Sequence, residues 1–276
     1  MRTLFATTAA LALAGSAALA EVTIGADARF NISHDSESED AIGVHQRFRV
    51  HFDASGVTDA GLTFSGGAIA DSSDGKVDDG VVSVSGAFGT LAFGAKDAAD
   101  VLAGGIADVG MVGVGVDNVA EDELRNKTDP GDLILYTHSL GDISVAVSGA
   151  PGTGGTDDMF AVGMSFTAAD IRIGFGYDSE KTMSLGGSYT FGQITANAYY
   201  AERDNLDGTG IDLSYGIGAT TLTLVAATNS QDQKAAGLGV SHDLGGGASM
   251  VAGFGQIPGE NGADKSGAEV GLSFTF

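Results

Sequence analysis

Cysteine and tryptophan are both missing from this chain of 276 residues, and only three prolines occur. Without cysteine, no disulfide can stabilise the fold and no thiol chemistry is available. Proline cannot donate a hydrogen bond to a β-ladder, so its scarcity suits a protein that consists mostly of strands. These absences favour an all-β fold that is held together by backbone hydrogen bonds rather than by covalent cross-links.

Basic side chains are scarce as well, with 13 Lys and Arg against 36 Asp and Glu, for a net charge of −23. Nucleic-acid binding requires a basic face, so this class of partner is excluded. The acidic excess instead favours cations or a charged surface in contact with water. A chain with 44 glycines and this charge could be disordered, but its 43% hydrophobic content argues against disorder.

The first 20 residues have the features of a secretory signal peptide. Arg2 precedes an apolar stretch, and Ala18-Leu19-Ala20 forms a small-residue cleavage site. An uncleaved anchor helix is the alternative, but the segment is alanine-rich, only weakly apolar and directly followed by that site. We therefore expect cleavage before Glu21 and a mature chain, residues 21–276, that forms a single domain.

Segments of about 8 to 12 residues alternate apolar and polar side chains along most of the mature chain. In VHQRFRVHFD (44–53), for example, Val44, Phe48, Val50 and Phe52 share one face, and only Gln46 breaks the pattern. Sixteen such segments can be counted, and the last is SGAEVGLSFTF (266–276). Period-two alternation predicts strands with one apolar and one polar face.

The connections between these segments alternate in length. One set is tight, such as 139–142, 191–193 and 218–219, and the other set is longer and charged, such as 34–43, 71–80 and 202–210. Tight turns at one end and long polar loops at the other are typical of an up-and-down antiparallel meander. The longest charge-free window, 182–201, has polar atoms at every second position, so we interpret it as two strands and a turn.

Three architectures could cover the apolar faces: a soluble sandwich, a solenoid, or a closed barrel in lipid. A sandwich core would need large interlocking side chains on the buried faces, and a solenoid would need a fixed repeat, which is missing. The polar faces are rich in Gly, Ser and Thr, which suits a wide, water-filled interior. In lipid every backbone group must be paired, so we expect the last strand to close the barrel against VTIGADARF (22–30).

These features resemble a Gram-negative general-diffusion porin, of the sixteen-stranded alphaproteobacterial type. The resemblance rests on the signal peptide, the GADARF-type first strand, the VHQRFRVHFD second strand, the long third loop and the terminal SFTF. It implies an outer-membrane β-barrel for passive diffusion of small hydrophilic solutes and ions. It also implies a homotrimer in contact with lipid and lipopolysaccharide, and a terminal Phe276 that the barrel-assembly machinery recognises.

Residues 97–131 are too long for an ordinary connection and carry apolar groups that could grip the inner wall. By resemblance, this loop folds into the lumen and forms the constriction. Its acids would face a basic wall made of Arg29, Arg47 and Arg49, and the resulting transverse field would favour polar solutes. Alternatively, these arginines form structural ion pairs with Asp27, Asp53 or Glu269. The candidate acids are Asp97, Asp100, Asp108, Asp117, Glu121, Asp122 and Glu123.

Two further alternatives stay open: a non-conducting structural or adhesive barrel, and a soluble secreted β-protein that binds calcium. No catalytic or nucleotide-binding motif is complete and the five histidines are scattered, so neither an enzyme nor a cofactor is expected. Acid pairs such as 78–79 and 157–158 could take calcium, although solvated surface charge is the default for each. The net charge favours cations in the pore, whereas the arginines oppose this preference.

Overall fold

The computed structural model describes residues 20–38, 41–73, 75–95, 97–111, 113–122, 124, 133–152, 157–259 and 264–276. Within these residues, sixteen antiparallel strands close into one barrel, in which neighbours in sequence are neighbours in the sheet. The predicted signal peptide lies outside the described residues except for Ala20. In the described part of the chain, no helix has the length and apolar character needed to cross a membrane.

The strands of the first half of the barrel vary from seven to sixteen residues. They are β1 (Glu21–Asp35), β2 (Ile42–Val57), β3 (Thr63–Asp71), β4 (Lys76–Gly86), β5 (Gly89–Ala95), β6 (Leu133–Leu140), β7 (Ile143–Ala150) and β8 (Met159–Ala168).

The second half of the barrel is a regular series of hairpins. Its strands are β9 (Ile171–Asp178), β10 (Met183–Phe191), β11 (Ile194–Arg203), β12 (Leu206–Ile217), β13 (Thr220–Asn229), β14 (Lys234–Gly245), β15 (Ala248–Pro258) and β16 (Asp264–Thr275).

The barrel closes where the sequence predicts it, between the first and the last strand. β1 pairs with β16 in antiparallel register, with Arg29 opposite Ser273 and Ile32 opposite Val270. The amide of Phe276 adds a hydrogen bond of 2.8 Å to the carbonyl of Ala26. The seam therefore leaves no sheet edge to meet lipid, as a membrane barrel requires.

Alternation along each strand separates an apolar outer face from a polar inner face. On β12, Ile211 is 57% exposed and Leu213 43%, whereas Asp212 between them is 4% exposed. The exposed side chains of the other strands are likewise mostly large and apolar, and they include Ile24, Phe30 and Leu224. Such a surface is stable only in a hydrocarbon environment.

The short turns lie at one end of the barrel. Gly192 and Gly218 start two-residue turns with φ values of 61° and 60°, a conformation that glycine adopts without a steric penalty. Two predicted loops are mostly strand. In 202–210, β11 ends at Arg203 and β12 begins at Leu206, and in 71–80, β3 ends at Asp71 and β4 begins at Lys76. Residues 206–210 therefore alternate inward and outward in the barrel wall instead of projecting from it.

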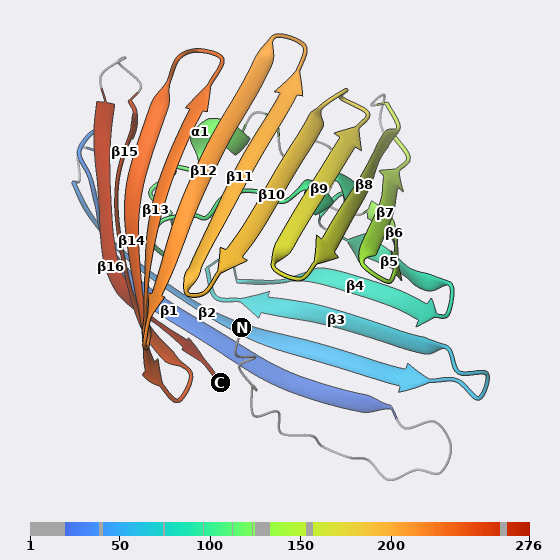
Figure 1. Ribbon diagram of the computed structural model, residues 1–276. Coiled ribbons are helices and arrows are strands. Elements are labelled where there is room, and N and C mark those ends of the chain that lie inside the picture. The colour runs from blue at the N-terminus through green and yellow to red at the C-terminus, as the bar shows by residue number, and fades with distance from the viewer. Residues whose placement is uncertain are drawn as a thin grey trace.

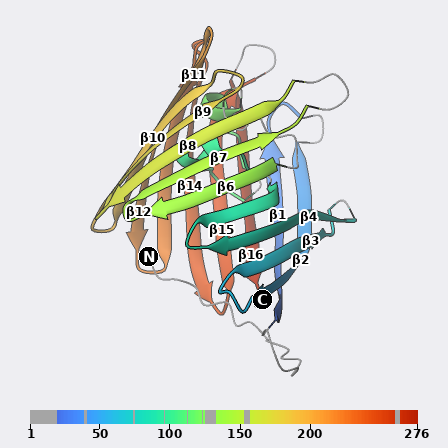
Figure 2. The same cartoon turned by 90° about the vertical axis from the view of Figure 1, so that its right-hand side faces the viewer.

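The described residues between β5 and β6 lie inside the barrel. They contain a short 3-10 helix, η1 (Ala99–Ala103), and a single turn of α-helix, α1 (Asn118–Glu121). Figures 1 and 2 show both on the concave side of the strands. Val109, Val116 and Leu124 from this segment are buried with inward side chains such as Tyr199 and Val225. Hydrophobic burial thus holds the segment against the wall.

A new charge should destabilise the barrel far more on the outer face of a strand than on its inner face. We expect Leu213→Arg to destabilise the barrel by about 2–4 kcal/mol, since its side chain would enter hydrocarbon. Ser214→Arg, one residue further, should cost much less because its side chain faces the water-filled interior. Urea unfolding from lipid vesicles would measure both variants. Equal losses would contradict the assignment of the two faces.

Candidate functional site

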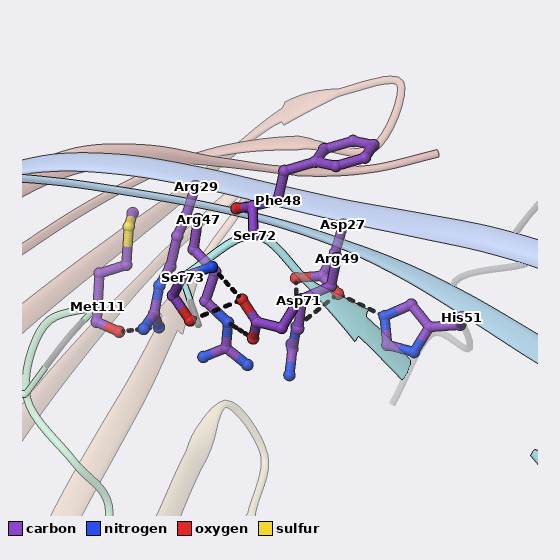
Figure 3. A network of polar contacts seen from close by, with 10 residues as sticks. All are labelled: Asp27, Arg29, Arg47, Phe48, Arg49, His51, Asp71, Ser72, Ser73 and Met111. Carbon is purple, nitrogen blue, oxygen red and sulfur yellow. Dashed lines mark hydrogen bonds and ion pairs between the residues drawn. The ribbon is translucent and has the colours of Figure 1, made fainter. Parts of the chain in front are cut away.

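Three inward arginines lie side by side at the barrel seam. In the pairing of β1 with β2, Arg29 lies directly opposite Arg47, and Asp27 lies directly opposite Arg49. Figure 3 shows the three guanidinium groups together with Asp71, which comes from the end of β3. The expectation that Arg29, Arg47 and Arg49 cluster on one wall therefore agrees with the structure.

Each arginine has an oxygen partner. Arg47 forms an ion pair of 2.7 Å with Asp71, and Arg49 forms one of 3.0 Å with Asp27. The same Asp27 carboxylate lies 2.5 Å from Nε2 of His51. Two of the three positive charges thus face carboxylates on their own wall, and these pairs hold the guanidinium groups in fixed positions.

Arg29 makes a different contact, because its Nη1 donates a 2.8 Å hydrogen bond to the carbonyl of Met111. Met111 belongs to the inserted segment, so this bond joins that segment to the basic wall. A cavity of about 510 Å³ lies at this junction and is lined by Asp27, Arg29, Arg49 and Met111, among others. This space therefore reaches Arg29 and Arg49 directly.

The acids of residues 97–124 occupy two different environments. Asp100 and Glu121 are buried, with 5% and 6% of their surface exposed, and Glu121 accepts a 2.7 Å hydrogen bond from the amide of Ile106. Asp97, Asp108 and Asp122 are exposed, and Asp117 is half-buried. Glu123 lies outside the described residues. Only part of the predicted acidic set therefore faces the lumen.

Asp108 and Asp117 interact closely near Glu269 of β16. Partial loss of solvent around the Asp108 carboxyl, which still borders open space, raises its pKa to about 6, and the neighbouring negative charge of Asp117 adds to this shift. Burial also raises the pKa of Asp117, with a further contribution from the charge of Glu121. These carboxyl groups border a cavity of about 400 Å³ that His45 and Lys265 also line.

Several side chains that hold the segment in place were not recognised from the sequence as its anchors. Glu269 accepts hydrogen bonds from the amides of Met111 and Gly113 and from Asn31, the last at 2.8 Å. Asp212 accepts a 2.8 Å bond from the amide of Ala107. Strand parity places Glu269 and Asp212 inward, but the bonds they form depend on the path of the loop.

Metal binding receives no support from the described residues, where no group of three or more His, Asp and Glu is arranged to hold an ion. Calcium at the acid pairs 78–79 and 157–158 stays a prediction. Phe276 ends on the outer surface, 62% exposed, with its ring 6.4 Å from that of Phe274. Its role as an assembly signal also stays a prediction.

The comparison with known proteins decides the family, because a model described as Gram-negative porin matches residues 6–262. The chain belongs to the Gram-negative porin family. A porin of Rhodobacter capsulatus is 32% identical over 310 aligned residues, which cover 93% of this chain and all of the relative. The family predicted from the sequence is confirmed, and with it the multi-pass location in the outer membrane.

Solved structures agree with this assignment. A porin structure refined at 1.8 Å resolution has a TM-score of 0.72 and 26% identity, and it covers 93% of this chain and all of its own. A variant of the Rh. blastica porin has a TM-score of 0.76 over 92% of this chain and all of its own. At 15% identity, this second likeness concerns the fold alone. The predicted sixteen-stranded barrel is thus confirmed.

The raised pKa of Asp108 predicts a pH-dependent pore charge. The carboxyl should be about nine-tenths ionised at pH 7 and about one-tenth at pH 5, whereas an ordinary aspartate stays ionised over this range. Cation preference, measured by reversal potentials in a salt gradient, should therefore decrease as pH falls from 7 to 5. Asp108→Asn, which cannot ionise at this position, is the control and should flatten the change. An identical pH profile in the variant would refute the assignment.

Proposed function

We propose that residues 97–131 form the constriction of a diffusion channel whose opposite side is the wall of Arg29, Arg47 and Arg49. The observation that carries this proposal is the bond from Arg29 to the Met111 carbonyl, because it joins the inserted segment to the basic wall. Solutes would pass between charged groups in water, which favours small hydrophilic molecules and ions. The family consists of channels, and we propose no catalytic activity for this member.

The charge balance supports a preference for cations. The wall of three arginines is faced by Asp27 and Asp71, which leave about one positive charge in excess. Asp97, Asp108 and Asp122 on the loop are exposed, and the whole chain carries a net charge of −23. Acids at the constriction and at the mouths therefore outweigh the remaining positive charge of the wall and raise the local concentration of cations.

A homotrimer is the proposed assembly. Its support is the sequence resemblance together with an aromatic row across the outer face of the seam, where Phe30, Phe274, Phe276 and Phe48 follow one another with ring centroids 6.2–6.5 Å apart. Large flat rings are effective contact residues between subunits. Phe276 of this row is also the proposed assembly signal.

Reconstitution into a planar lipid bilayer tests both the channel and the assembly. We expect each insertion event to raise the current by three equal levels, one for each barrel of a trimer. Single equal steps would support the channel and count against the trimer. A bilayer that stays silent with correctly folded protein would contradict the channel and favour a structural or adhesive barrel.

Neutralising the basic wall should strengthen cation preference. Arg47→Gln combined with Arg49→Gln removes the arginine partners of Asp71 and Asp27, so the net charge of the wall becomes more negative by two. In a tenfold salt gradient, the reversal potential should move toward the ideal cation value of about 59 mV.

Lys181→Gln combined with Lys234→Gln is the matched control, because it removes the same charge from a turn and from the end of a strand. This control should move the reversal potential much less. Equal shifts in the two double variants would place Arg47 and Arg49 outside the constriction.

A further inference from the structure

Four glycines lie on the inner wall beneath η1. Gly163 on β8, Gly174 and Gly176 on β9 and Gly186 on β10 face the loop, and we call these four residues the glycine floor. A Cβ added at Gly163 would lie 1.9 Å from the carbonyl oxygen of Ala99. At the other three positions it would lie 2.1, 2.5 and 2.2 Å from carbonyl oxygens of Leu102, Asp100 and Ala103, respectively. The loop backbone thus rests directly on the strand backbone.

Strand geometry does not explain these glycines. None of the four has a positive φ, so other residues could adopt the same backbone conformation. Glycine inside a strand is unfavourable, since it has no side chain to pack and loses more conformational freedom on folding. Close approach of another backbone is a known reason for glycine in a strand, and here that backbone belongs to the loop.

The same contact continues along the path of the loop. A Cβ at Gly208 of β12 would lie 1.9 Å from the carbonyl oxygen of Ala120, and one at Gly253 of β15 would lie 2.8 Å from the Cα of Gly110. A contrasting example comes from the part of the inner wall that the loop does not cover. Gly25 of β1 also faces the lumen, opposite His51, but a Cβ there would meet nothing within 4 Å. Beneath the loop, an added Cβ would thus meet the loop itself, whereas at the inward Gly271 of β16 it would meet the wall's own backbone, 2.2 Å from the carbonyl oxygen of Phe30.

Hydrogen bonds between wall side chains and the loop backbone fix the same part of the loop. The guanidinium group of Arg172, on β9, donates hydrogen bonds of 2.5 Å to the carbonyl of Leu102 and 3.4 Å to that of Ala103. The amide of Ala99 donates a 2.8 Å bond to the hydroxyl of Ser148 on β7. These bonds hold η1 down against the floor, while the floor itself limits how closely η1 can approach the wall.

We propose that the glycine floor and Arg172 are positioning residues that set how far the loop projects into the lumen and thereby set the width of the pore. This inference deepens the proposed function and rests on it. Because backbone touches backbone, the height of the loop above the wall has the smallest value that the chain allows. One methyl group on the floor has to raise η1 toward the pore axis by about 1.5 Å, the difference between 1.9 Å and an ordinary contact of 3.4 Å.

The test compares three alanine variants of the full chain in planar bilayers. Gly163→Ala and Gly174→Ala add a methyl group under η1, and Gly25→Ala adds one to the open wall. We expect the two floor variants to lower single-channel conductance and to exclude polyethylene glycols of a size that the wild-type pore admits. Gly25→Ala should keep the wild-type conductance and size limit. Wild-type values in both floor variants would overturn the proposal, although the wild-type channel itself would still support the proposed function.

A second background separates an effect on the loop from an effect on the strands. In a chain where a short Gly-Ser linker replaces residues 99–121, the wall no longer carries the loop, so Gly163→Ala should change neither folding nor conductance. Such a cycle isolates the interaction between two sites. Folding is followed by the gel mobility of unheated samples. A floor variant that misfolds only with the loop present supports the proposal, and one that misfolds in both backgrounds overturns it.

Discussion

The constraint on which the rest of the structure depends is that a backbone in lipid must pair all of its polar groups. A sheet meets this demand only by closing on itself, and the pairing of β1 with β16 achieves the closure. Once the sheet is closed, every strand has one face in hydrocarbon and one in the interior. The apolar outer face, the polar lumen and the inner wall that receives the loop are therefore consequences of one hydrogen-bonding requirement.

The closed wall divides into two parts with different tasks. The strands from β7 to β16 carry most of the inserted loop and present many small residues to it, whereas β1, β2 and β3 present charged side chains, of which Arg29 contacts the loop. Arg47 and Arg49 are paired with carboxylates, which cancel most of their charge. The field across the lumen therefore arises from a small net charge and acts only over a short distance. Salt screens charges in water over about 10 Å at 0.1 M, and the effect of these groups is therefore confined to the narrow section.

Strands and their faces could be predicted from the sequence because alternation is a local signal that each segment carries by itself. The position of the loop could not, because contacts such as Glu269 with Met111 join residues far apart in the chain. The sequence predicts that inward glycines line a wide lumen, yet those beneath the loop are contact residues. The segments 71–80 and 202–210 resemble loops because of their charges and glycines, although strand pairing continues through most of each.

Several acids inside the barrel accept hydrogen bonds from the loop backbone, and this role limits what they contribute to the charge of the pore. An irregular segment has no ladder partners, so its buried amides need other acceptors. Glu121 supplies one for Ile106, and Asp212 supplies one for Ala107. Carboxylates occupied in this way are largely withdrawn from water and contribute little to the attraction of solutes at the entrance. The selectivity of the channel must then depend on the acids that remain in solvent, such as Asp97 and Asp122. The total number of acidic residues in the loop therefore overstates the preference for cations.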